Sequence, residues 1–146
     1  MGYILSEKYV DKDGKLVMND LAGYAKKEYV YDSRGNMIKE AYYGLDGNLM
    51  MNKALGYAAR ETVVDNNGFF TEEKYLNEKG NLIYVDVMGY AEVERKYVNG
   101  MYTGEIQYNA DGSIIKTLDK NGNEVVAKLK VSSSSSSVSF VKMRKF

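Results

Sequence analysis

Short runs rich in aromatic and β-branched residues alternate along the chain with turn-forming residues. Tyr, Val, Ile, Thr and Phe dominate these runs, which is typical of β-strands. We predict strands over residues 24–31, 37–43, 57–64 and 69–76. The turn signals between the runs lie too close together for helices of ordinary length. The pattern therefore predicts an all-β fold of antiparallel hairpins.

Glycine marks the ends of the predicted hairpins. The glycines in question are Gly14, Gly35, Gly47, Gly68, Gly80, Gly100, Gly112 and Gly122. Six of these eight follow an Asp or Asn by three residues, as in Asp32-Ser33-Arg34-Gly35. An Asp or Asn side chain accepts backbone N–H bonds at the first turn position, and glycine adopts the left-handed conformation that closes a bulged hairpin. The chain contains no proline, so these residues must build its turns.

A tandem repeat organises the hairpins. The tripeptide Gly-Tyr-Ala begins at residues 23, 56 and 89, a spacing of 33 both times, and residues 23–55 match residues 56–88 at 12 of 33 positions. Each repeat contains strands that cannot bury their apolar residues alone, so neighbouring units must pack against one another. The sequence therefore predicts tandem 33-residue repeats of antiparallel hairpins that form an elongated, solenoid-like sheet.

The repeat divides the chain into three predicted parts. The array covers residues 1–131, with units at 1–22 (partial), 23–55, 56–88 and 89–124 and a closing strand at 123–131. A Ser-rich linker follows at residues 132–139, and residues 140–146 form a basic C-terminal tail or a capping strand. Gly2 lies 33 residues before Gly35, so the chain begins within a predicted turn. We expect it to be a fragment of a larger protein.

Composition argues against catalysis and against a bound cofactor. The chain has no His and no Cys, which excludes disulfides, thiolate nucleophiles, Cys/His zinc sites and triads that need an imidazole. Carboxylates recur with the repeat, as Glu7, Glu40 and Glu73 do, whereas an active site needs two acids in different environments. We therefore predict that the protein is not an enzyme and that it has no catalytic residue and no cofactor.

The Asp-rich turns at residues 11–14 and 119–123 raise the question of a calcium site. The calcium loop of an EF-hand ends in a bidentate Glu at its twelfth position. Counting from Asp11 and Asp119, that position holds Ala22 and Lys130. Turn formation accounts for these acids, so we predict no metal site.

Tyrosine occurs 14 times and recurs with the spacing of the repeat. The candidate ligand-binding residues are Tyr9, Tyr24, Tyr42, Tyr43, Tyr57, Tyr75, Tyr90 and Tyr108. If these rings are exposed, they form a surface on which sugar faces or the side chains of a partner can stack. Tyrosine is also a good strand residue that packs across a sheet, so the same columns can equally form the core. The sequence leaves both interpretations open.

The charge of the chain narrows its possible partners. The net charge is zero, so the basic field that steers proteins onto nucleic acid is missing, and no nucleic-acid partner is expected. Five cations and no acid follow Glu124, so residues 1–124 carry −5 and the remainder carries +5. The basic end at 142–146 suggests a weak anchor for anionic surfaces. No apolar run reaches the length of a membrane span, so membrane contact is otherwise not expected.

Two segments resemble known repeats. Residues 31–36, Tyr-Asp-Ser-Arg-Gly-Asn, resemble the Tyr-Asp-x-x-Gly-Asn core of bacterial YD (RHS-type) repeats. Residues 42–50, Tyr-Tyr-Gly-Leu-Asp-Gly-Asn-Leu-Met, are similar to the hairpins of glucan-binding and cell-wall-binding repeats. The resemblance covers residues 3–124. It implies tandem β-hairpins of an extracellular or cell-surface protein, used for carbohydrate binding, for adhesion, or as the wall of a shell.

Two functional hypotheses follow from the repeat and the resemblance. The first is a non-catalytic module of a bacterial surface or secreted protein that binds a glycan or a surface protein. The alternative is a structural spacer or self-assembling fibre or shell element, whose end strands pair with copies of themselves.

Overall fold

The computed structural model describes residues 2–126, 129–131 and 138–140. Within these residues every regular element is a β-strand, which confirms the all-β prediction. They include no helix long and apolar enough to cross a bilayer. Most of the predicted linker at 132–139 and of the tail at 140–146 lies outside the described residues.

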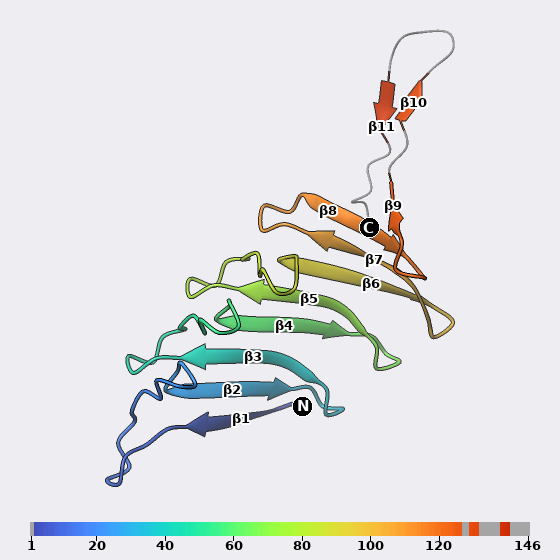
Figure 1. The fold of residues 1–146 in the computed structure, drawn as a ribbon. Helices are drawn as coiled ribbons and strands as arrows, with labels where there is room; N and C mark the ends of the chain where they lie inside the picture. The colour runs from blue at the N-terminus through green and yellow to red at the C-terminus, as the bar shows by residue number, and fades with distance from the viewer. Residues whose placement is uncertain (1, 127–128, 132–137, 141–146) are drawn as a thin grey trace.

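Nine strands form one open antiparallel sheet in which each strand lies next to its neighbour in sequence (Figure 1). They are β1 (Tyr3–Lys8), β2 (Lys26–Tyr31), β3 (Met37–Tyr43), β4 (Ala59–Val64), β5 (Phe70–Leu76), β6 (Glu92–Val98), β7 (Met101–Tyr108), β8 (Ile114–Asp119) and β9 (Glu124–Val125). A separate pair is formed by β10 (Leu129–Val131) and β11 (Val138–Phe140). The elongated sheet of consecutive antiparallel hairpins confirms the predicted fold class.

The predicted turn chemistry is present at the hairpins. All eight predicted glycines have φ between +78° and +87°. At the β2–β3 turn, the Asp32 carboxylate accepts bonds from the backbone N–H groups of Arg34 and Asn36, both at 2.9 Å. The pairing register also shifts beside this turn, between Val30 and Tyr31. The β2–β3 hairpin is therefore closed by an Asp side chain, a left-handed glycine and a local bulge, whereas β6–β7 closes through Asn99 and Gly100, which both have positive φ.

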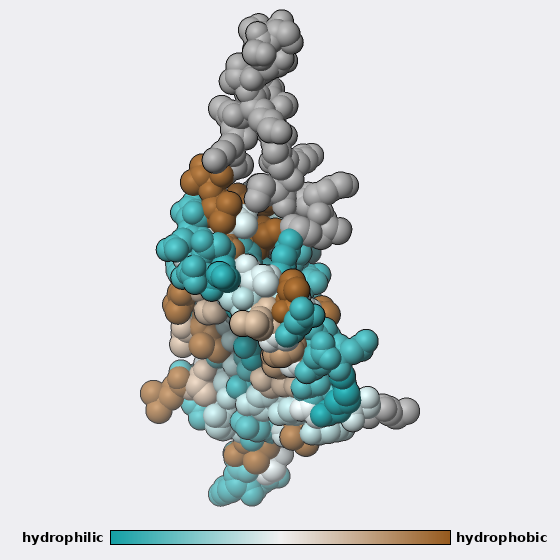
Figure 2. All heavy atoms as spheres, turned by 90° about the vertical axis from the view of Figure 1, so that its right-hand side faces the viewer, coloured by the Kyte–Doolittle hydropathy of each residue, from teal (hydrophilic) through white to brown (hydrophobic). Residues whose placement is uncertain are grey.

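The connections at the two ends of the strands differ in length. On the side where β2, β4 and β6 end, tight turns connect them to β3, β5 and β7. Figure 2 looks onto this side, where hydrophilic and hydrophobic residues are interspersed. On the opposite side, longer connections, here called the side loops, cover residues 9–25, 44–58 and 77–91 (Figure 1). One side of the sheet thus carries only short turns, and the other carries the three side loops.

Each side loop contains a second turn that the sequence pattern did not predict. The N–H groups of Gly23, Gly56 and Gly89 donate to carbonyls four residues earlier, at 2.7–2.8 Å, and all three glycines have positive φ. Tyr24 and Tyr57 pair with Asn19 and Asn52 in these turns. Strands β2 and β4 consequently begin at residues 26 and 59, two residues later than predicted.

The core lies where the strand ends meet the side loops. Its buried members are Tyr24, Tyr42, Tyr57, Tyr75, Val85, Tyr90 and Val93. Tyr42, Tyr75 and Val93 come from strands, whereas the other four come from side loops. The side loops thus provide a second layer over one part of an otherwise single-layered sheet.

Candidate functional site

The predicted tyrosine columns form a continuous file of rings through the core. Successive ring centroids are 5.5, 4.9, 6.2, 5.0 and 6.1 Å apart along the order Tyr9, Tyr24, Tyr42, Tyr57, Tyr75 and Tyr90. The rings are tilted or edge-on to one another, which is the favoured arrangement of packed aromatic side chains. We call this file the tyrosine ladder.

The tyrosine ladder is largely inaccessible from solvent. Six of the eight candidate tyrosines are buried, with exposed fractions of 8% or less: Tyr24, Tyr42, Tyr57, Tyr75, Tyr90 and Tyr108. Tyr9 and Tyr43 are half-buried. The burial of these six rings favours the interpretation in which the columns form the core and pack neighbouring hairpins together, and it leaves them no exposed face on which a ligand can stack. A ligand-binding role for Tyr9 and Tyr43 stays a prediction.

A buried carboxylate accompanies the ladder in the middle of the sheet. The hydroxyls of Tyr42 and Tyr57 both donate to Glu40 Oε1, at 3.1 and 2.8 Å. Lys27 Nζ and Arg60 Nη2 approach Glu40 Oε2 to 3.7 and 3.9 Å from the strands on either side. Glu40 is only 8% exposed, so this set of partners compensates for removing its charge from water.

A related arrangement recurs further along the sheet. Glu73 accepts a hydrogen bond from the Tyr75 hydroxyl, and Arg95 Nη1 lies 3.5 Å from Glu73 Oε2. Arg95 also approaches Glu105, whose other donors are Tyr102 at 2.7 Å and Gln107 at 2.7 Å. Acidic and basic side chains therefore alternate from strand to strand along the ladder. The arrangement is that of a structural network along the sheet, in which each carboxylate has hydroxyl and cationic partners.

The tyrosine ladder predicts a specific response to alkaline pH. Burial, assisted by neighbouring carboxylates, raises the pKa of Tyr42, Tyr57 and Tyr75, and it raises the pKa of Tyr24 to about 12. A raised folded-state pKa contributes stability that is complete below the ordinary tyrosine pKa near 10 and is lost as pH rises through the folded value. We expect cooperative unfolding above about pH 10, with the buried phenols ionising only as the chain unfolds.

Phenolate absorbance and circular dichroism, recorded together during a pH titration, test this expectation. In urea, all 14 tyrosines should ionise in one step. In the native chain, the exposed phenols should ionise first. The buried phenols should ionise at the pH at which the β-sheet signal in circular dichroism is lost. A single native step near pH 10 with the β signal intact would contradict the buried ladder.

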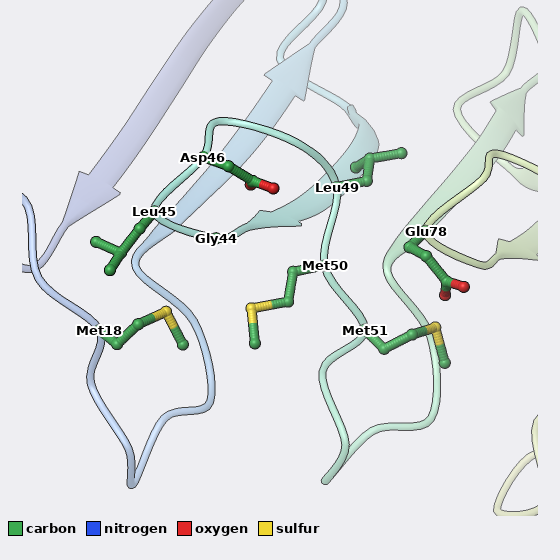
Figure 3. A pocket seen from close by; sticks show the side chains of 8 residues that line it. All are labelled: Met18, Gly44, Leu45, Asp46, Leu49, Met50, Met51 and Glu78. Atoms are coloured by element: carbon green, nitrogen blue, oxygen red, sulfur yellow. The ribbon is translucent and has the colours of Figure 1, made fainter.

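A pocket of about 520 Å³ opens between the first two side loops. Its lining residues are Met18, Gly44, Leu45, Asp46, Leu49, Met50, Met51 and Glu78 (Figure 3). Met18 comes from the first side loop and Met50 and Met51 from the second, and in Figure 3 Met50 lies between the other two methionines. The thioethers form a flexible apolar wall, and two carboxylates lie at its margins. Here we call this the methionine pocket.

The methionine pocket continues into a second hollow and toward exposed apolar residues. A neighbouring hollow of about 370 Å³ shares all three methionines and extends to Leu21 and Ala54 at the loop tips. Leu21 is 100% exposed and Leu45 is 57% exposed. This surface was not predicted from the sequence. The one signal that could have found it is the 33-residue spacing of Met18 and Met51, because equivalent positions of neighbouring repeats lie side by side.

Two aromatic pairs away from the ladder are stacked. The rings of Tyr3 and Tyr31 stack with centroids 4.9 Å apart, and those of Phe69 and Tyr97 stack at 4.7 Å, both pairs at an interplanar angle of 15°. Tyr3 is 51% exposed and the other three are half-buried. A sugar could reach these rings more readily than the buried tyrosines of the columns.

The first Asp of each Asp-rich turn accepts hydrogen bonds from backbone N–H groups of the same turn. Asp11 Oδ1 accepts the N–H groups of Asp13 and Lys15, and Asp119 Oδ1 accepts those of Asn121 and Asn123, all at 2.9 Å. Throughout the part of the chain that the structure describes, no group of three or more acidic side chains converges as a metal site would require.

Comparison with known proteins gives no relative from which a function can be carried over. No protein-family model matches the chain, and neither a curated protein nor a solved structure matches it. The case for function therefore rests on the surfaces of this molecule.

Proposed function

We propose that this chain is a non-catalytic binding module that holds an apolar, basic segment of another protein in the methionine pocket. The observation that carries the proposal is the pocket itself, an apolar hollow between two side loops with exposed Leu45 in its lining and exposed Leu21 in the neighbouring hollow. Methionine is unbranched and polarizable, so a methionine-rich surface adapts to varied apolar side chains. Exposed apolar groups that gather around a hollow are typical of protein interaction sites.

The two carboxylates at the margins of the pocket favour a bound segment that carries a cationic residue beside its apolar residue. The backbone and side-chain N–H groups of Asn48 bind the Asp46 carboxylate and lower its pKa, so Asp46 remains charged in mildly acidic solution. Glu78, on the following side loop, is exposed. A Lys or Arg beside an apolar anchor would gain a charge–charge attraction from either acid, an attraction that a neutral sugar lacks.

Peptide display against the full chain tests this proposal. We expect the selected peptides to combine an apolar residue with a nearby Lys or Arg. Glu78→Lys should weaken their binding by roughly five- to tenfold, because it replaces an attraction with a repulsion at a partly solvated site. Asp86→Lys makes the same charge change at an exposed position of the third side loop and should have little effect. Affinities from fluorescence polarisation decide the outcome.

Two results would reject the pocket as the binding site. One is a library that yields no apolar, basic peptide. The other is a selected peptide whose affinity is the same for the parent chain, for Glu78→Lys and for Met51→Glu, since the last change places a charge on the apolar wall.

Glycan binding is the second candidate, carried by the stacked aromatic pairs. Tyr31 and Tyr97 each belong to a pair that solvent reaches, and exposed rings are what sugar faces stack on. A glycan array probed with the parent chain and with Tyr97→Ala separates the candidates, because loss of a signal in the variant would favour the sugar. The extracellular or cell-surface location rests on the resemblance to YD repeats and belongs to the same proposal.

A further inference from the structure

Three asparagines of this chain are followed directly by glycine: Asn67, Asn99 and Asn121. All three are exposed and lie in hairpin turns. At such a pair, the backbone nitrogen of the glycine can attack the side-chain carbonyl carbon of the asparagine, because glycine has no Cβ to obstruct the approach. The three turns therefore carry the same reactive dipeptide, and their hydrogen bonds decide which of them reacts first.

At two of these turns the glycine nitrogen is already a hydrogen-bond donor. The N–H of Gly68 donates to the carbonyl of Asp65 at 3.1 Å, and the Asp65 carboxylate accepts the N–H of Asn67 at 2.9 Å. The turn at Asn121 repeats this arrangement, with Asp119 as the acceptor of both bonds, at 3.0 and 2.9 Å. A glycine nitrogen held in this way can attack only after the turn opens locally, because its proton must leave and its orientation must change.

The turn between β6 and β7 differs from these two (Figure 1). It consists of Asn99 and Gly100, with φ of 51° and 78°, between the paired strand ends Val98 and Met101. Positive φ at both central residues is the requirement of a type I′ turn. The N–H of Gly100 donates to no acceptor among the residues that the structure describes. The nitrogen that would attack Asn99 is thus exposed and has no hydrogen bond to break.

We propose that Asn99 is a site of spontaneous deamidation in the folded protein and that it reacts before Asn67 and Asn121. The nitrogen of Gly100 forms a bond to Asn99 Cγ, the bond between Cγ and the side-chain nitrogen breaks, and ammonia leaves with the proton of the backbone amide. Water then opens the resulting five-membered imide. Opening at one carbonyl gives an aspartate, and opening at the other gives an isoaspartate, in which the main chain runs through Cβ. This site does not depend on the function proposed above.

The isoaspartate product would disturb the end of the β6–β7 hairpin. It adds a negative charge and one main-chain atom to a turn whose geometry requires two residues. The turn also lies next to an aromatic pair, because a Cβ at Gly100 would be 3.9 Å from the ring of Phe69, which stacks on Tyr97. We therefore expect the pairing of Val98 with Met101 to open and the surroundings of this solvent-accessible aromatic pair to change.

Peptide mapping of the full chain during incubation at mildly alkaline pH tests the proposal. Tryptic cleavage places the three asparagines on separate peptides, residues 61–74, 97–116 and 121–128, and fragment masses assign each deamidated position. In the folded chain, Asn99 should react about five- to tenfold faster than Asn67 and Asn121, the factor expected from one hydrogen bond that must first be broken. In urea, where the turns are absent, all three should react at similar rates.

Two outcomes of this mapping would overturn the proposal. One is a folded chain in which Asn67 or Asn121 reacts as fast as Asn99. The other is a folded chain in which Asn99 stays intact under conditions that deamidate it in urea.

Two variants test the physical cause and the effect on the fold. Asp65→Ala removes the carboxylate from the turn at Asn67, so deamidation should become faster there and stay unchanged at Asn99. An unchanged rate at Asn67 would exclude hydrogen bonding as the origin of the selectivity. Asn99→Gly removes the reactive amide and keeps a dipeptide that type I′ turns accept. After the same incubation, the parent chain should unfold at a lower urea concentration than before, whereas Asn99→Gly should not change. An equal change in both chains would exclude the expected effect of deamidation on the hairpin.

Discussion

Gly104→Ala is expected to lower the free energy of unfolding by about 3 kcal/mol or more, because it combines backbone strain with a steric clash. Gly104 has φ of +141°, and a Cβ at this position would clash with the backbone carbonyl oxygen of Leu118. That oxygen belongs to the backbone of β8, so no side-chain movement can relieve the contact. Strands β7 and β8 would have to separate at the Gly104–Asp119 and Glu105–Leu118 pairs.

Gly68→Ala is the matched control. Gly68 has φ of +87°, but a Cβ there would have no neighbour within 4 Å, so alanine meets only the conformational cost of about 1–2 kcal/mol. Urea unfolding followed by circular dichroism measures both variants. Similar losses at the two positions would show that the close approach of β7 and β8 at Gly104 does not exist in solution.

The hairpins could be predicted from the sequence because their determinants are local. Asp32 and Gly35 lie within one turn, and the side-chain bonds and the positive φ that their spacing indicates are both present. Gly104 could not be identified in this way. It has no turn signal beside it, and its constraint comes from Leu118 on a different strand.

The tyrosine columns show where sequence periodicity stops being informative. A spacing of 33 residues places Tyr42 and Tyr75 at equivalent positions, but it does not say whether those positions face solvent. The answer depends on the side loops, whose second turn at Gly56 brings Tyr57 between the two rings. The cationic partner of Glu40 could not be predicted for a related reason. Arg60 reaches Glu40 from the neighbouring strand, so the pair can be identified only once the register of β3 and β4 is known.

The methionine pocket could not be predicted without the relative positions of three side loops. Its walls come from two side loops and its acidic margin includes Glu78 of a third, so it exists only when the side loops lie next to one another. Sequence spacing relates Met18 to Met51, but the hollow between them depends on how far apart the sheet holds the loops. The same stacking that buries the tyrosines thus creates the candidate site, which links the stability of the core to the shape of the binding surface.

That link makes the centre of the tyrosine ladder the most sensitive part of the molecule. Tyr75 is 2% exposed and packs against Tyr57 and Tyr90, while its hydroxyl donates to Glu73. Tyr75→Ala is expected to cost about 3–5 kcal/mol, the usual loss for a large buried aromatic residue. Tyr75→Phe keeps the ring and should cost about 1.5–3 kcal/mol, because it removes a hydrogen bond to a charged group.

Tyr9→Ala is the comparison that gives the result its meaning. Tyr9 is half-buried at the end of the ladder and contacts one ring, that of Tyr24, so its loss should cost only about 1–2 kcal/mol. Urea unfolding at constant m-value measures all three variants against the parent chain. A gradient from Tyr75 to Tyr9 is what a stacked array requires, because a central residue couples two neighbours and a terminal residue couples one. Equal losses at Tyr75 and Tyr9 would show that the rings stabilise their own hairpins separately and that the ladder is not a shared core.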